Sequence, residues 1–239
     1  MTEHAVGALM LFVSGLIRGF SGFGFAIAAM PLLTLLRPPA EVVPLVLLLQ
    51  FAISLQGLRG AWAEADFASL RWLAPGALLG TPLGLWALAL LPADPVRLVI
   101  AALVGLTVAI LAGGFRLHRT PVGPAIGLVG LASGLCNGLA AMPGPPVIAY
   151  YLAVPLRASA GRAAMILLFL LTAMIGLLLV AGRIDRPLLA MAAAGLPVVW
   201  AGSLLGDWMY RRSAHAGYRR VALWMLGAAG AAAALRALV

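Results

Sequence analysis

The sequence predicts an all-α, polytopic integral membrane protein built from two structural repeats. Of its 239 residues, 64% are hydrophobic and only 10% are charged, whereas soluble domains carry about 25% charged residues. The mean hydropathy is +1.08. The hydrophobic residues fall in runs of about 20, which is the length of a membrane-spanning helix. Together these observations exclude a soluble globular enzyme.

The expected elements follow one another in two sets of four. The first set is a broken apolar stretch over 5–36, interrupted near Gly19 to Gly24, and helices over 42–58, 70–91 and 95–115. The second set is a broken stretch over 122–154, interrupted near Gly138 to Pro146, and helices over 160–181, 188–209 and 217–238. The N-terminus lacks the basic region of a signal peptide, so we expect the first stretch to remain in the mature protein.

The two sets match each other at a shift of 119 residues. Under this shift Gly15 falls on Gly134, Gly19 on Gly138 and Gly76 on Gly195. We therefore expect an N-terminal repeat over 1–119 and a C-terminal repeat over 120–239, both within one membrane domain. Internal repeats of this kind are common in secondary transporters.

Each broken stretch is too long for one straight crossing, because about 32 helical residues span about 48 Å against a hydrocarbon core of about 30 Å. Each stretch is either a kinked crossing or a re-entrant hairpin. Eight full crossings would place seven arginines on one side and eight on the other, whereas two hairpins and six crossings would place five and ten. The positive-inside rule favours the hairpins. This arrangement inverts the repeats and puts both termini outside the cytoplasm.

The two breaks are the predicted site of function. Glycine and proline stop a helix, and unpaired backbone at membrane depth survives only when it is buried or lines a wet cavity. Two facing breaks would aim backbone N–H groups and positive helix ends at one midplane point, which suits an anion. Arg18 lies inside the first stretch. Its guanidinium either contacts a bound oxyanion or is held by backbone carbonyls.

The candidate substrate-binding residues come from both breaks. Ser21 and Asn137 could donate hydrogen bonds to a substrate, or they could cap the half-helices and tie the breaks together. Glycines at four-residue spacing, as in Gly76, Gly80 and Gly84, predict close helix packing. The full candidate set is Arg18, Ser21, Gly22, Gly24, Asn137, Gly138, Gly144 and Pro145.

Other kinds of chemistry find little support. Cys136 is the single cysteine, which excludes an internal disulfide and a Cys-rich metal site, and we expect no cofactor. The arginines stand singly or in pairs between apolar runs, as loop markers rather than a nucleic-acid patch. An intramembrane enzyme would need a base, and His4, His118 and His215 lie outside the segments or at their ends. A non-transporting membrane subunit remains an alternative.

Two motifs carry a family resemblance. They are Arg18-Gly19-Phe20-Ser21-Gly22-Phe23-Gly24 followed by Pro31-Leu32-Leu33, and Gly134 and Gly138 followed by Gly144-Pro145-Pro146-Val147. At these residues, and over essentially its whole length, the chain resembles the sulfite exporter TauE/SafE family. The resemblance implies a multi-pass secondary transporter of the bacterial inner membrane that moves sulfite or an organosulfonate. A carboxylate or another sulfur compound is the alternative substrate. A coupling proton or sodium ion and a homo-oligomer stay open.

Overall fold

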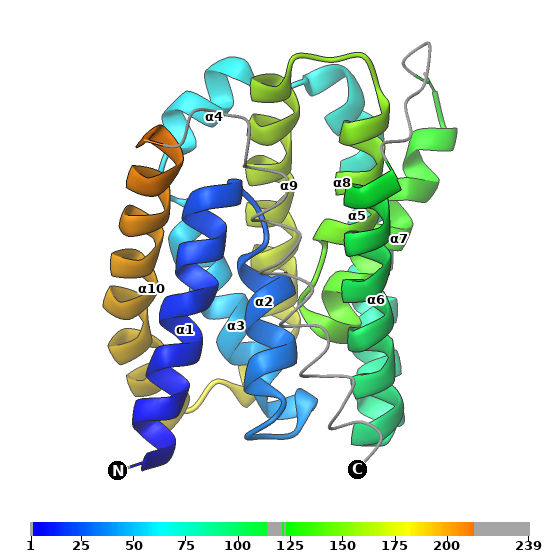
Figure 1. Ribbon diagram of the computed structural model, residues 1–239. Coiled ribbons are helices and arrows are strands. Elements are labelled where there is room, and N and C mark those ends of the chain that lie inside the picture. Colours follow the sequence, from blue (N-terminus) through cyan, green and yellow to red (C-terminus); the bar gives the residue numbers. More distant parts are fainter. Residues whose placement is uncertain (1, 114–120, 122, 213–239) are drawn as a thin grey trace.

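The fold is entirely helical within the described residues, as the sequence predicts (Figure 1). The computed structural model describes residues 2–113, 121 and 123–212. The predicted helix over 217–238 lies outside these residues. The elements are α1 (Thr2–Ser21), α2 (Phe25–Leu33), α3 (Pro39–Ser54), α4 (Leu58–Glu64), α5 (Phe67–Leu90), α6 (Ala93–Gly113), α7 (Ala125–Ala140), α8 (Gly144–Ala153), α9 (Ala158–Leu179), the short 3-10 helix η1 (Ala181–Arg183) and α10 (Arg186–Arg212).

Several described helices are long and apolar enough to cross a membrane. These are α1, α5, α6, α9 and α10, and α3 with α4 would make a further span that is bent by 73°. The expected continuous helix over 42–58 is therefore wrong at its end. Helix α3 stops at Ser54, and Gly57, with φ +80°, starts α4 in a new direction. Large apolar side chains such as Leu128 and Leu178 stay exposed on the outside of the bundle, where lipid would cover them.

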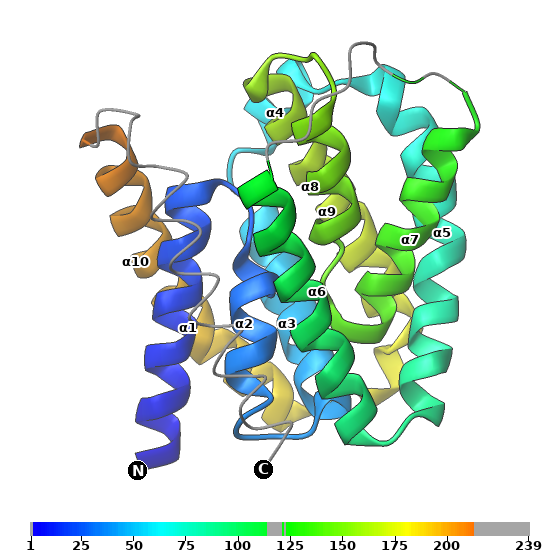
Figure 2. The same ribbon diagram turned by 45° about the vertical axis from the view of Figure 1, so that its right-hand side comes forward.

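Both broken stretches are hairpins. Figures 1 and 2 show α2 running back along α1 and α8 running back along α7. In the first hairpin, His4 at the start of α1 lines the same cavity as Leu36, just beyond α2. In the second hairpin, Tyr150 near the end of α8 reaches Ser69 in the first turn of α5, at the end of the bundle where α7 begins. The two hairpins open toward opposite ends of the bundle.

Specific backbone features reverse the chain at each break. Gly22 (φ +80°) and Gly24 (φ +104°) adopt left-handed conformations that favour glycine, and Gly24 directly precedes α2. Helix α7 ends at Ala140, and the next residue, Ala141, adopts φ +50°. Pro145 lies in the first turn of α8, where a missing N–H costs nothing.

Two parallel helix pairs form the outer layers of the bundle. Helix α1 packs along α10, and α5 packs along α7. Glycines allow this contact: a Cβ at Gly19 would lie 2.0 Å from the Ser203 carbonyl oxygen, and one at Gly80 would lie 2.2 Å from that of Leu131. The prediction of close packing at these glycines is confirmed. Helices α3 and α9 lie between the pairs, together with the half-helices α2 and α8 and with α6.

The arginines divide unequally between the two ends of the bundle. We call the end that holds the start of α1 the N-terminal face and the opposite end the arginine-rich face. Among the described residues, Arg37, Arg97, Arg183 and Arg186 lie toward the N-terminal face, and Arg59, Arg71, Arg157, Arg162, Arg211 and Arg212 lie toward the arginine-rich face. The positive-inside rule therefore predicts that the arginine-rich face is cytoplasmic.

Single cysteines at exposed glycines should report this orientation. Gly60 lies toward the arginine-rich face and Gly182 toward the N-terminal face, and an added Cβ would meet no neighbour at either position. In a Cys136→Ala background, a membrane-impermeant maleimide added to intact spheroplasts should label Gly182→Cys and not Gly60→Cys. After the membrane is permeabilised, both variants should react. Labelling of Gly60→Cys in intact spheroplasts would show that the orientation is the opposite of the predicted one.

Candidate substrate-binding site

The first break is a tight turn organised by Ser21. Its Oγ lies 2.7 Å from the Ile17 carbonyl oxygen and also contacts the Phe23 carbonyl oxygen. The Phe23 N–H donates to the same hydroxyl, with an N···O distance of 3.3 Å. Ser21 therefore ties the end of α1 to the turn that precedes α2, which is the structural role considered for it above.

Arg18 lies in the last turn of α1 and is partly buried. Its Nη2 donates a hydrogen bond of 2.8 Å to the carbonyl oxygen of Ile53, in the last turn of α3. Carbonyls at a helix C-terminus carry partial negative charge, so this contact orients the guanidinium. Because a carbonyl bears no net charge, the positive charge of Arg18 is not neutralised by it.

Arg162 supplies a second guanidinium at the same turn, although its place in the sequence is that of a loop arginine. It lies in the second turn of α9. A Cβ at Gly22 would lie 2.2 Å from Arg162 Nε, so the guanidinium occupies the space that a side chain at position 22 would need. The positive charges of Arg162 and Arg18 repel each other. The ion pairs Arg37–Glu41 and Arg97–Asp94 include neither Arg18 nor Arg162.

The second break is organised by uncharged groups. Asn137 is fully buried, and its Nδ2 donates to the Thr172 carbonyl oxygen at 3.0 Å. Its Oδ1 has no hydrogen-bond partner in the described part of the chain. Ser133 Oγ donates to the Pro143 carbonyl oxygen at 2.7 Å, which ties α7 to the turn before α8.

The remaining candidates of the second break lie in closely packed surroundings. Gly138 presses against the backbone of α5, where a Cβ would lie 2.1 Å from the Thr81 carbonyl oxygen. Gly144 and Pro145 are buried in the first turn of α8. A Cβ at Gly144 would lie 2.9 Å from Ile27 Cδ1, so the start of α8 touches a side chain from the first turn of α2.

Arg18 and Asn137 occupy corresponding positions, and so do their partners. We call two residues that lie 119 positions apart counterparts. Arg18 and Asn137 are counterparts, and their acceptors Ile53 and Thr172 are counterparts as well. Helices α2 and α8, α3 and α9, and α5 and α10 also begin at counterpart residues. The same hydrogen bond thus recurs in both halves, with a charged donor in one and a neutral donor in the other.

Apolar side chains fill the space between the two breaks. Phe25, Ile27, Met142 and Ile148 are each at most 2% exposed. The structure therefore brings Arg18, Ser21, Gly22 and Gly24 together at one turn. It brings Asn137, Gly138, Gly144 and Pro145 together at the other, and joins the two turns through Ile27.

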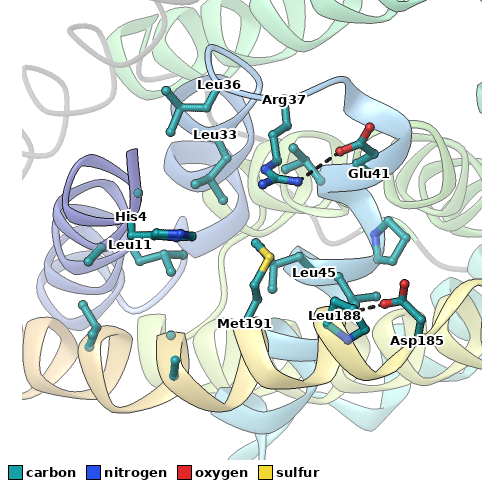
Figure 3. Close-up of a pocket in the computed structure, with 18 of the residues that line it drawn as sticks. His4, Leu11, Leu33, Leu36, Arg37, Glu41, Leu45, Asp185, Leu188 and Met191 are labelled. Atoms are coloured by element: carbon teal, nitrogen blue, oxygen red, sulfur yellow. Dashed lines mark hydrogen bonds and ion pairs between the residues drawn. The ribbon is translucent and has the colours of Figure 1, made fainter. Parts of the chain in front are cut away.

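A cavity of about 540 Å³ opens toward the N-terminal face (Figure 3). It lies between the first hairpin, α3 and the start of α10, and Figure 3 shows His4 projecting between these elements. Arg37 and Glu41 form an exposed ion pair of 3.4 Å at its mouth. The cavity includes residues of five separate helices, so it is a tertiary feature that no local sequence pattern predicts. Its apolar walls include Leu11, Leu33, Leu36, Leu45, Leu188 and Met191.

Comparison with known proteins identifies the family of the chain. The family model described as sulfite exporter TauE/SafE matches residues 7–233. A probable sulfite/organosulfonate exporter TauE from Cupriavidus necator is 30% identical over 229 residues, which cover 91% of this chain and 88% of that relative. No solved structure matches. The chain belongs to the sulfite exporter TauE/SafE family of membrane transporters.

Proposed function

We propose that the protein is a secondary transporter that carries sulfite or a small organosulfonate across the bacterial inner membrane. The family and the name of the Cupriavidus necator relative support this substrate class. The observation that carries the proposal is the pair of guanidinium groups, Arg18 and Arg162, at the turn formed by Gly22 and Gly24. Neither takes part in an ion pair within the described residues. Two such cations in a largely apolar protein favour a negatively charged ligand.

The turn offers backbone donors beside these cations. Gly24 precedes α2 without a side chain that caps the helix, so the first N–H groups of α2 are not satisfied by a capping side chain. The N-terminus of a helix attracts anions through these N–H groups and through its dipole. Arginine binds planar or tetrahedral oxyanions with two parallel hydrogen bonds. The proposed site is therefore Arg18, Arg162 and the backbone around Gly22 to Ala26.

We further propose that residues 1–119 and 120–239 are inverted repeats and that alternating access comes from their relative movement. Three helices of one half and three of the other begin at counterpart residues, and the hairpins open toward opposite faces. Gly22 and Ala141, which are counterparts, both adopt positive φ. These correspondences support a common architecture for the two halves.

Ligand-induced stabilisation of the purified full chain tests the substrate class. Sulfite and methanesulfonate should raise the melting temperature, and a ligand at one hundred times its dissociation constant contributes about 2.7 kcal/mol. Acetate tests the carboxylate alternative, and choline chloride is the cationic control. Uptake of the stabilising anion into proteoliposomes should then distinguish a transporter from a binding subunit. If no anion stabilises the protein or enters the vesicles, the proposal is wrong.

A further inference from the structure

The residues that correspond to the cavity walls lie at the arginine-rich face, and Ser69, Tyr150 and Ala164 there are at most 6% exposed. Resting on the proposed function, we propose that the cavity is the open half of the anion pathway. We also propose that the hydrogen bond between Tyr150 and Ser69 holds the other half shut. The structure would then represent the state that is open to the N-terminal face.

The walls of the cavity correspond to the elements around Tyr150. Residues at the start of α10, Leu188 and Met191, line the cavity, and their counterparts at the start of α5 are Ser69 and Trp72. Both helices start in the same way. Asp185 accepts a hydrogen bond from the Leu188 N–H at 2.9 Å, and its counterpart Asp66 accepts one from the Ser69 N–H at 3.4 Å.

Two aromatic side chains distinguish the closed half from the open half. Tyr150 and Tyr151 of α8 are the counterparts of Pro31 and Leu32 of α2. The two rings pack edge to face with centroids 5.0 Å apart. The Tyr151 ring lies against Gly161, where a Cβ would be 3.2 Å from Tyr151 Cδ1. Gly161 is the counterpart of Val42, which lines the cavity. The Tyr151 ring therefore covers the counterpart of a residue that lines the open cavity.

A single polar contact joins Tyr150 to the first turn of α5. The Tyr150 hydroxyl and Ser69 Oγ are 2.8 Å apart, and the two residues are 6% and 2% exposed. Because α5 belongs to the outer pair with α7, this hydrogen bond connects the α5/α7 pair to the half-helix α8. On the open side Leu188 stands in place of Ser69 and offers no side-chain hydrogen bond.

The closed half also contains polar groups that gain from opening. Trp72 Nε1 and the Tyr151 hydroxyl are buried without a hydrogen-bond partner in the described part of the chain. A buried donor without a hydrogen-bond partner costs free energy. If this half opened, water could enter it and form hydrogen bonds with both groups. The Tyr150–Ser69 bond thus opposes a tendency to open, as expected for a gate with two states of similar free energy.

Cysteine accessibility in detergent-solubilised full-length protein tests the gate. In a Cys136→Ala background, Ala8→Cys reports on the cavity that Ala8 lines, and Ala164→Cys reports on the closed half. Ala164 is 0% exposed and is the counterpart of Leu45, another cavity residue. A cationic methanethiosulfonate reagent should modify Ala8→Cys rapidly and Ala164→Cys slowly. Adding Tyr150→Phe should raise the rate for Ala164→Cys about fivefold relative to Ala8→Cys, the size expected for one buried hydrogen bond.

Two further variants make the result decisive. Ser69→Ala removes the same hydrogen bond from the other side and should reproduce the effect of Tyr150→Phe. Tyr151→Phe removes the hydroxyl of the neighbouring ring, which has no hydrogen-bond partner in the described part of the chain, and should not raise the rate for Ala164→Cys relative to Ala8→Cys. Equal parental rates at both probes, or an unchanged ratio in both Tyr150→Phe and Ser69→Ala, would overturn the proposal. These rates are measured without substrate, so a failure of the anion assays remains a separate result.

Discussion

Arg18→Ala should abolish anion transport while the protein still inserts and folds. The substitution removes a guanidinium at the Gly22–Gly24 turn, and truncating one partner of a desolvated charge pair costs about 2–5 kcal/mol, or about thirtyfold or more in affinity. Folding should tolerate the change. The lost bond to Ile53 contributes about 1 kcal/mol, whereas a central arginine costs about 2.5–3.5 kcal/mol on insertion. The measurement is anion uptake by proteoliposomes, with the melting temperature of the same preparation as the check on folding.

Two variants give the Arg18 result its meaning. Arg157→Ala removes an arginine from the same face, at the residue before α9, and should transport at the parental rate. Arg18→Lys keeps the charge and loses the planar fork, so its transport should fall between those of the parent and Arg18→Ala. Parental transport by a folded Arg18→Ala protein would leave the carbonyl-bound structural role as the explanation of Arg18.

Gly80→Ala should prevent normal folding although it adds a single methyl group. The new Cβ would lie 2.2 Å from the Leu131 carbonyl oxygen and 2.8 Å from the Leu135 nitrogen, both in the backbone of α7. Backbone atoms cannot move aside as a side chain can, so α5 and α7 must separate along their whole contact. Overpacking of this kind costs about 1–3 kcal/mol or more. The measurement is the melting temperature and the yield of monodisperse protein after solubilisation.

The control for Gly80→Ala is the same change on a free helix surface. Gly105 lies in α6, and a Cβ there meets nothing within 4 Å. Gly105→Ala should leave the protein as stable as the parent or slightly more stable, because alanine favours helix more than glycine does. If the two variants melt at the same temperature, close backbone contact between α5 and α7 does not limit stability.

The positions of the helices could be predicted because each membrane-spanning helix requires a long run of apolar residues. Long apolar runs fix the segments, and the glycines at Gly15, Gly19, Gly76 and Gly80 fix which faces touch. The hairpins could be inferred only indirectly, because a kinked crossing and a hairpin have the same length and composition. The bend before α4 was not predicted, because a single glycine at position 57 in an apolar segment does not indicate that its φ is positive.

The candidate site was predictable in part for a similar reason. Arg18 is an isolated charge inside an apolar stretch, so its position alone identifies it. Arg162 lies only a few residues from the start of α9, where an arginine commonly marks the membrane surface, and only the fold brings it onto Gly22. The cavity and the Tyr150–Ser69 contact depend on segments 81 residues apart or more, and no local pattern predicts such contacts.

The two outer layers each combine a helix from one half with a helix from the other: α1 with α10, and α5 with α7. One half alone would therefore expose the glycine-lined face of its first helix to lipid, because the partner helix comes from the other half. If the halves are the inverted repeats proposed above, an ancestral polypeptide of half this length would have needed a second copy in the opposite orientation to complete both layers. Gene fusion of such an antiparallel dimer would preserve the α1–α10 and α5–α7 contacts. It would also free each half to diverge, as arginine and asparagine have done at positions 18 and 137.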